Sequence, residues 1–117
     1  MKIRFMNGSE LPYISALEME EFFNGASRRT LTFDIRKNYS IDAINTLASN
    51  ENNLTTLELI NEDEGVTNYY DGYVLKLKLG IEQYLVDPET DTYDEKIVLK
   101  LGKRTYIEQR LHELGIG

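Results

Sequence analysis

Carboxylates are the side chains of this sequence that most readily suggest chemistry, and they crowd one short segment. That segment reads DPETDTYDE and holds Asp87, Glu89, Asp91, Asp94 and Glu95. Oxygen ligands at alternate positions are typical of calcium loops, but an EF-hand also needs a glycine at its sixth position and a glutamate at its twelfth, which this segment lacks. We therefore interpret the segment as a solvated hairpin loop and expect no metal site.

Two further groups of carboxylates could supply acid and base catalysis: Glu18, Glu20 and Glu21 in one segment, and Glu62, Asp63 and Glu64 in another. Such chemistry requires two carboxyl groups in different environments that face each other across a cleft. Nothing in the spacing brings these groups together, and carboxylates in an acidic domain ordinarily keep it soluble. We expect no catalytic residue and a protein that is not an enzyme, with a hydrolase as a less favoured alternative.

The other residue types that carry chemistry are scarce. His112 is the only histidine and the chain has no cysteine, so neither a zinc site nor a nucleophilic triad has the residues that it needs. The glycines at positions 8, 25, 65 and 72 stand apart and do not form a phosphate-binding loop. We expect no cofactor.

An arginine pair opens the segment RRTLTFDIR, in which apolar and polar residues alternate. In a strand, Arg29 shares the face of Leu31 and the apolar residues that follow it, whereas Arg28 lies on the opposite face. An inward arginine near a strand end can pair with Glu18 or Glu20 across a hairpin and fix the register, and we favour this structural role. Because arginine is also enriched in interfaces, Arg28 is a candidate interface residue.

Tyrosines supply the second indication of an interface. Tyr69, Tyr70 and Tyr73 cluster around one Asp-Gly pair. Tyrosine is favoured where a surface is half apolar and half wet, as in protein contacts, although packing at the rim of a sheet would also use it. The candidate protein-interface residues are therefore Tyr69, Tyr70, Tyr73 and Arg28.

These side chains have to be positioned by strands, because most of the chain alternates apolar and polar residues with a period of two. Asn24-Gly25 and the segment 62–65 are typical of hairpin turns. Residues 11–23 would also suit a helical turn, and Asp71-Gly72 is either a two-residue turn or a bulge in one long strand. The predicted strands cover residues 2–5, 11–23, 28–36, 54–61, 66–70, 73–86 and 96–102.

Two segments change to a helical period. Ser40 stands at the N-cap position of the first, whose apolar residues recur three apart, and this predicts a helix over residues 41–49. The second begins with the capping box Thr105-Tyr106-Ile107-Glu108 and ends before Gly115, which predicts a helix over residues 106–114. We expect its apolar face to pack against the sheet or over a barrel mouth; that face holds Ile107, Leu111 and Leu114.

A chain of 117 residues is long enough for one domain and too short for two of ordinary size. The predicted elements indicate one mainly β domain over residues 1–117, with one short internal helix and a C-terminal helix. We expect an antiparallel β-barrel or a strongly curved meander sheet, with a β-sandwich as the nearest alternative. Closure would bury the apolar face of strands whose other face carries Lys76, Lys78 and Lys100.

The charge of the chain restricts its partners. With 20 acidic and 13 basic residues, the formal net charge is -7. Such a surface repels nucleic acid and anionic lipid unless its basic residues gather on one face, so we expect neither as a partner. The sequence shows no signal peptide and no apolar run long enough to span a membrane, and we expect a soluble protein.

The order of these features resembles small proteins from prophages of Gram-positive bacteria. The resemblance rests on FFNGASRRTLTF, on the short helix before an Asn-rich break, on YYDGY and on the closing KIVLKLGKRTYIEQRL. Members of that group look like products of the tail or baseplate region with largely unassigned roles. The resemblance implies a structural, protein-binding role in the virion or, during assembly, in the host cytoplasm, and it transfers no functional residue.

We therefore expect a non-enzymatic phage or prophage structural or assembly protein whose partners are other particle proteins or further copies of itself. The main alternative is a small-ligand or carbohydrate-binding β-barrel, because tyrosines and carboxylates could line a concave mouth. An inhibitor of a host protein is also open, since an acidic surface can mimic nucleic acid.

Overall fold

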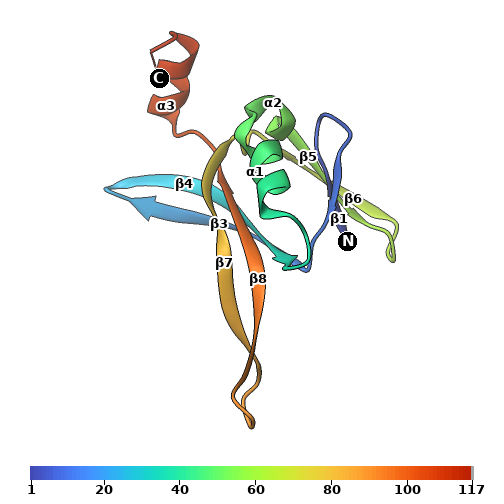
Figure 1. Cartoon of the computed structure of the whole chain (residues 1–117). Helices are drawn as coiled ribbons and strands as arrows, with labels where there is room; N and C mark the ends of the chain where they lie inside the picture. Colours follow the sequence, from blue (N-terminus) through green and yellow to red (C-terminus); the bar gives the residue numbers. More distant parts are fainter. Residues whose placement is uncertain (117) are drawn as a thin grey trace.

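The computed structural model describes residues 1–116, which form two four-stranded antiparallel sheets and three helices (Figure 1). The first sheet has the strand order β2-β1-β5-β6, with β1 (Lys2–Arg4), β2 (Glu10–Pro12), β5 (Thr56–Asn61) and β6 (Val66–Asp71). The second has the order β3-β4-β8-β7, with β3 (Ser15–Phe23), β4 (Ala26–Arg36), β7 (Leu75–Asp87) and β8 (Thr92–Gly102). The predicted mainly β class is confirmed.

The strands do not confirm the predicted barrel, because among residues 1–116 no strand pairing joins the edges of the sheets into a closed wall. The chain passes between the sheets three times: from β2 to β3, from β4 to β5 through the two short helices, and from β6 to β7. The predicted strand 11–23 is broken at Tyr13 and Ile14: the Tyr13 amide donates to the carbonyl of Met1, next to β1 of the first sheet, and the Ile14 amide donates to the carbonyl of Asp34 in β4 of the second. Gly72, with a φ of +82°, ends β6 in the first sheet, and β7 begins in the second. Asp71-Gly72 is therefore neither a hairpin turn nor a bulge but a connection between sheets.

One hydrophobic core lies between the two sheets. The alternating residues Leu31, Phe33 and Ile35 of β4 meet Ile97, Leu99 and Leu101 of the neighbouring strand β8, and all of them are buried. The first sheet adds Ile3, Leu57 and Leu59 to the same cluster. Because side chains of a strand alternate between faces, each sheet turns its apolar set inward and leaves its other face largely polar.

Two short helices close one side of this core. The predicted helix 41–49 is confirmed as α1 (Ile41–Ser49), and the Ser40 hydroxyl accepts a hydrogen bond from the Ala43 amide at 3.2 Å as an N-cap. The Asn-rich break that follows contains α2 (Glu51–Leu54), which the polar composition did not indicate. Leu54 explains it, because this fully buried side chain anchors the segment in the core.

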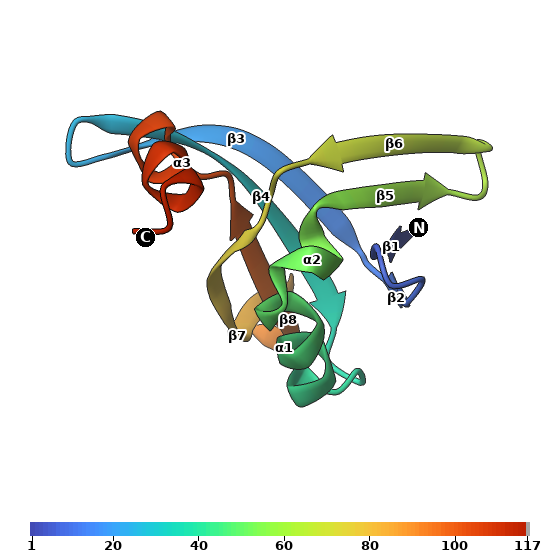
Figure 2. The same cartoon turned by 90° about the horizontal axis from the view of Figure 1, so that it is seen from above.

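The hairpins extend beyond the body of the molecule, which measures 54 × 34 × 27 Å along its principal axes. Its radius of gyration of 15.6 Å exceeds the roughly 13 Å of a compact chain of this length. Figure 2 shows the β3–β4 and β5–β6 hairpins projecting to opposite sides. The β3–β4 turn confirms the Asn24-Gly25 signal, because both residues have the positive φ, +50° and +81°, that such a turn requires.

The β7–β8 hairpin forms the longest projection (Figure 1). Its pairing with β4 stops at Arg36 and Lys96, so residues 82–95 continue as a two-stranded ribbon, here called the β7–β8 arm. The predicted acidic loop 87–95 is shorter than expected: β7 ends at Asp87, and β8 begins at Thr92. Ribbon pairing thus extends almost to the tip.

The C-terminal helix α3 (Tyr106–Glu113) begins with the predicted capping box. The Thr105 hydroxyl accepts from the Glu108 amide at 3.2 Å, and the Glu108 carboxylate accepts from the Thr105 amide at 2.9 Å. The expectation that its apolar face packs on the sheet is wrong, because Ile107, Leu111 and Leu114 are exposed. Polar contacts on the other side of α3 hold the helix instead, as described below.

We expect Leu99→Ala to lower the free energy of unfolding by about 2–5 kcal/mol, because Leu99 is fully buried between β4 and β7 and its loss leaves a cavity. Leu85→Ala is the matched control on the arm, where the side chain is about half exposed, and it should cost less than about 1 kcal/mol. Urea unfolding followed by circular dichroism measures both. Equal losses for the two variants would contradict the assigned core.

Candidate protein-interaction surfaces

The three predicted tyrosines lie in different environments. Tyr69 is 64% exposed and lies on the outer face of β6, opposite Glu58 of β5. Tyr70 is half-buried and contacts Tyr73 edge to face, with 6.2 Å between the ring centroids. Tyr73 is fully buried, because the connection between the sheets carries its ring into the core. Of the three, Tyr69 is the one that a partner could contact extensively.

Tyr73 belongs to a polar cluster at the edge of the core rather than to a surface. Its hydroxyl donates to the Glu18 carboxylate, which also accepts from the Arg29 guanidinium at 2.8 Å. The Lys103 ammonium lies 5.0 Å from the centre of the Tyr73 ring. This cluster confirms the predicted inward role of Arg29, which pairs with Glu18 although Glu20 is its direct cross-strand neighbour.

The electrostatics of this cluster keep its groups in fixed protonation states at neutral pH. Burial and the hydrogen bond to Glu18 raise the pKa of Tyr73 to about 12. The hydrogen bond from Tyr73 lowers the pKa of Glu18, and Arg29 adds to the effect. A protonated hydroxyl therefore donates to an ionised carboxylate, an arrangement that joins the connection between the sheets to the β3–β4 hairpin.

Arg28 lies on the opposite face of β4 and contacts the C-terminal segment. Its guanidinium donates to the Lys103 carbonyl at 2.8 Å and forms an ion pair with Glu108 at 2.9 Å. The Arg28 hydrogen bond, together with the Thr105 amide, lowers the pKa of Glu108 to about 2. The donors of Arg28 thus hold α3 against β4, and the four predicted interface residues do not form one surface.

Polar contacts fix which side of α3 faces the body. Beside the Arg28–Glu108 pair, Glu51 of α2 pairs with Arg104 and lies 3.6 Å from the His112 imidazole. At 3.6 residues per turn, Glu108 and His112 share one side of the helix and point to the body. The apolar side is turned away from it. Ile107, Leu111 and Leu114 are 69%, 38% and 66% exposed, respectively.

A second exposed apolar surface lies on the β7–β8 arm. The core-facing side of this hairpin continues past Leu79 and Leu99 as Ile81, Gln83 and Leu85 on β7 and as Tyr93, Glu95 and Ile97 on β8. Ile97 is buried, but Ile81, Leu85 and Tyr93 are 57%, 46% and 57% exposed. In the described part of the chain, no third strand lies beside Leu85 and Tyr93, because the pairing of β4 with β8 stops at Arg36 and Lys96. Ile81 lies on the edge strand β7, in the row of Ile35 and Ile97.

Basic residues gather at one cleft on the outer face of the second sheet. The cleft has a volume of about 480 Å³ and is lined by Arg28, Leu77, Lys78 and Lys100. Each cation already has a carboxylate partner: Glu108 for Arg28, Glu82 for Lys78 and, at 2.6 Å, Glu21 for Lys100. Arg28 is therefore already part of an ion pair within the chain, and an anionic ligand would have to compete with these carboxylates.

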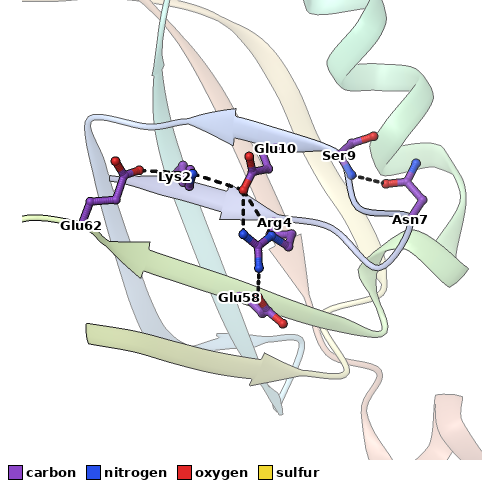
Figure 3. Close-up of polar contacts among 7 residues, drawn as sticks. All are labelled: Lys2, Arg4, Asn7, Ser9, Glu10, Glu58 and Glu62. Atoms are coloured by element: carbon purple, nitrogen blue, oxygen red, sulfur yellow. Dashed lines mark hydrogen bonds and ion pairs between the residues drawn. The ribbon is translucent and has the colours of Figure 1, made fainter. Parts of the chain in front are cut away.

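The outer face of the first sheet carries a separate ionic network (Figure 3). The Arg4 guanidinium pairs with Glu10 at 3.0 Å and with Glu58 at 3.1 Å, so it connects β1 to the strands on both sides. Lys2 pairs with Glu10 at 3.3 Å and with Glu62 at 3.5 Å. The Arg4 hydrogen bond lowers the pKa of Glu10, which keeps this carboxyl ionised and unsuited to act as a general acid near neutral pH.

The carboxylates considered for chemistry do not converge on one site. Glu18 and Glu21 pair with cations on opposite faces of β3, and Glu62 belongs to the network of the first sheet. Within residues 1–116 no three acidic or histidine side chains gather as a cation site would need. In the acidic segment, the Asp87 carboxylate accepts from the Glu89 amide at 3.0 Å and thereby shapes the turn.

Comparisons with protein-family models, with curated proteins and with solved structures find no match for this chain. None of the helices in residues 1–116 combines the length and the apolar character that a membrane crossing requires. The function therefore has to be inferred from the geometry of the exposed surfaces.

Sequence reasoning missed both exposed apolar surfaces. A helix with an apolar stripe has the same sequence pattern whether the stripe faces the core or the solvent. The outcome depended on tertiary partners, Arg28 for Glu108 and Glu51 for His112, which the sequence pattern does not show. On the arm, the alternation of β7 and β8 continued past the last residue of β4, which indicates a face without a third strand.

We expect Tyr73→Phe to raise the pKa of Glu18, because the hydroxyl of Tyr73 is the largest cause of its lowered value. Carbon-detected NMR titration of the Glu18 carboxyl measures the change. Tyr70→Phe is the matched control, since Tyr70 contacts the Tyr73 ring but no hydrogen bond connects it to Glu18. An unchanged titration of Glu18 in Tyr73→Phe would contradict the assigned hydrogen bond.

We expect acid to release α3 from the sheet. The pKa of Glu108 is lowered from 4.5 to about 2, so its ion pair stabilises docking fully above pH 4.5 and is lost as the pH falls toward 2. Amide chemical shifts of residues 105–114 should change over this range. Arg28→Gln should raise the pKa of Glu108 and displace the helix at neutral pH. Arg29→Gln is the control, and an equal effect of both variants on α3 would contradict the assignment.

Proposed function

We propose that this chain is a non-enzymatic structural or assembly protein that acts through protein–protein contacts, as a component or assembly factor of a phage or prophage particle. The particle setting comes from the resemblance of FFNGASRRTLTF, YYDGY and KIVLKLGKRTYIEQRL to small prophage proteins. The contact function is supported by the exposed surfaces. The two lines of support are independent, because the resemblance names no interface residue.

The orientation of α3 is the observation that carries this proposal. A surface helix normally buries its apolar stripe and exposes its polar side. Here Glu108 and His112 face the body, while Ile107, Leu111 and Leu114 face solvent. Leaving such side chains in water forgoes about 1.5–3 kcal/mol for each one that could be fully buried. An apolar surface held outward by ion pairs is suited to a partner, and the exposed Tyr69 offers a second contact point.

A small-ligand or carbohydrate-binding role has weaker support. It would place the ligand in the cleft of about 480 Å³ beside Arg28 and Leu77. The cations around that cleft pair with carboxylates of the same chain, and the space between the two sheets is filled by the core. A binding surface formed by α3 needs no rearrangement of these contacts.

The proposal is tested by removing the apolar face of α3 without disturbing its polar contacts. We expect a protein with Ile107→Ser, Leu111→Ser and Leu114→Ser to remain folded, because none of the three side chains is buried. Immobilised wild-type protein should retain either further copies of itself or a specific protein from prophage-carrying cells, as identified by mass spectrometry. The triple variant should lose that partner.

Gln109→Ser is the matched control on the same helix, because Gln109 is exposed and lies outside the apolar face. It should retain the partner as the wild type does. A wild-type protein that neither associates with itself nor retains any partner through α3 would contradict the proposed function.

A further inference from the structure

In the described part of the chain, the β7–β8 arm has no third strand beside it. Residues 82–95 form a ribbon of two strands that no other element of the described chain pairs with. A two-stranded ribbon is marginally stable in water and normally needs a third strand or a helix against its apolar face. The face that would receive such a partner holds Leu85 and Tyr93, and Ile81 adjoins them at the base of the arm; all three are exposed. We call these residues, together with Glu95, the arm patch.

The exposed side of α3 has a matching composition. Ile107, Leu111 and Leu114 lie within about 60° of one another around the helix, and Arg110 flanks them. We call these four residues the helix patch. No described residue pairs with the Arg110 side chain. Glu95 is exposed, and the nearby Lys37 donates its hydrogen bond to Asp94 rather than to Glu95. Each patch thus combines three apolar side chains with one exposed charge, and the two charges are opposite.

The wider charge distribution favours the same pairing. The arm, residues 82–95, contains no lysine or arginine, and its acidic residues are Glu82, Asp87, Glu89, Asp91, Asp94 and Glu95. Residues 103–116 contain Lys103, Arg104 and Arg110 against Glu108 and Glu113, which gives them a net charge of +1 in a chain of net charge -7. Opposite charge raises the rate and the specificity of association.

The two patches cannot meet within one molecule. Figure 1 shows α3 and the tip of the β7–β8 arm at opposite ends of the structure. The Arg28–Glu108 pair holds α3 at its own end. A contact between the patches therefore joins two molecules.

We propose that the helix patch of one copy docks on the arm patch of a second copy, with Arg110 facing Glu95 of the neighbour. The inference rests on the proposed function and names the partner of its surface. The contact is head to tail, because two different surfaces meet. A pair of copies therefore retains one free helix patch at one end and one free arm patch at the other. Repetition closes into a ring or continues as a filament, according to the rotation between neighbours.

A charge exchange tests the pairing directly. Light scattering across a wide concentration range should show self-association of the wild type. Arg110→Glu and Glu95→Arg should each weaken it about tenfold or more, as expected for an interfacial charge pair. The double variant with both changes should regain most of the lost association. Glu89→Lys, in the turn of the arm and outside the patch, makes the same change of charge and is the control; it should weaken association far less than Glu95→Arg does.

Mixing two blocked variants tests the head-to-tail geometry. Leu111→Asp removes the helix patch, and the pair Ile81→Asp and Leu85→Asp removes the arm patch, so each protein alone should be monomeric. Their mixture should form dimers and nothing larger, because one intact helix patch meets one intact arm patch. Circular dichroism of each variant verifies that it is folded.

Three results would overturn this inference: a monomeric wild type at every concentration, no recovery in the charge-exchanged double variant, or no dimer in the mixture. They leave the proposed function separately testable. A monomeric wild type that still retains a different protein through α3 refutes self-docking and supports the contact function. A monomer that retains nothing refutes both.

Discussion

The apolar core between the two sheets is the constraint on which the rest of this structure depends. Leu31, Phe33 and Leu99 of the second sheet and Ile3 and Leu57 of the first belong to one buried cluster. Neither four-stranded sheet could cover its apolar face alone, and the two short helices at residues 41–54 complete the cover. Burial of these side chains supplies the main stabilisation. The crossings near residues 13 and 72 allow the apolar faces of both sheets to pack in this one core.

Ion pairs and hydrogen bonds orient the segments that the core does not hold, namely the connection between the sheets and the terminal helix. The cluster of Tyr73, Glu18 and Arg29 joins the crossing segment to a hairpin, and Arg28 with Glu108 holds the terminal helix. Such contacts contribute little stability when exposed, but they fix the orientation of the segments that they join. For the terminal helix the direction is decisive, since it determines that the apolar side faces solvent, which is the basis of the proposed contact function.

The proposed role follows from projections rather than from a pocket. In a compact domain the long hairpin and the terminal helix would pack against the body. Here both extend away from it with apolar side chains exposed (Figure 1). The matched composition of the two surfaces and their positions at opposite ends are suited to repeated assembly.

The local elements follow from the sequence, because period-two alternation, the Asn24-Gly25 turn and the caps at Ser40 and Thr105 act over a few residues. The inward position of Arg29 also follows from it, by strand parity. Tertiary structure alone decided that the strands divide into two sheets, that Tyr73 is buried and that the terminal helix turns its apolar side outward. These outcomes depend on which distant groups meet, and residue pattern encodes the faces of an element but not the partner that each face will find.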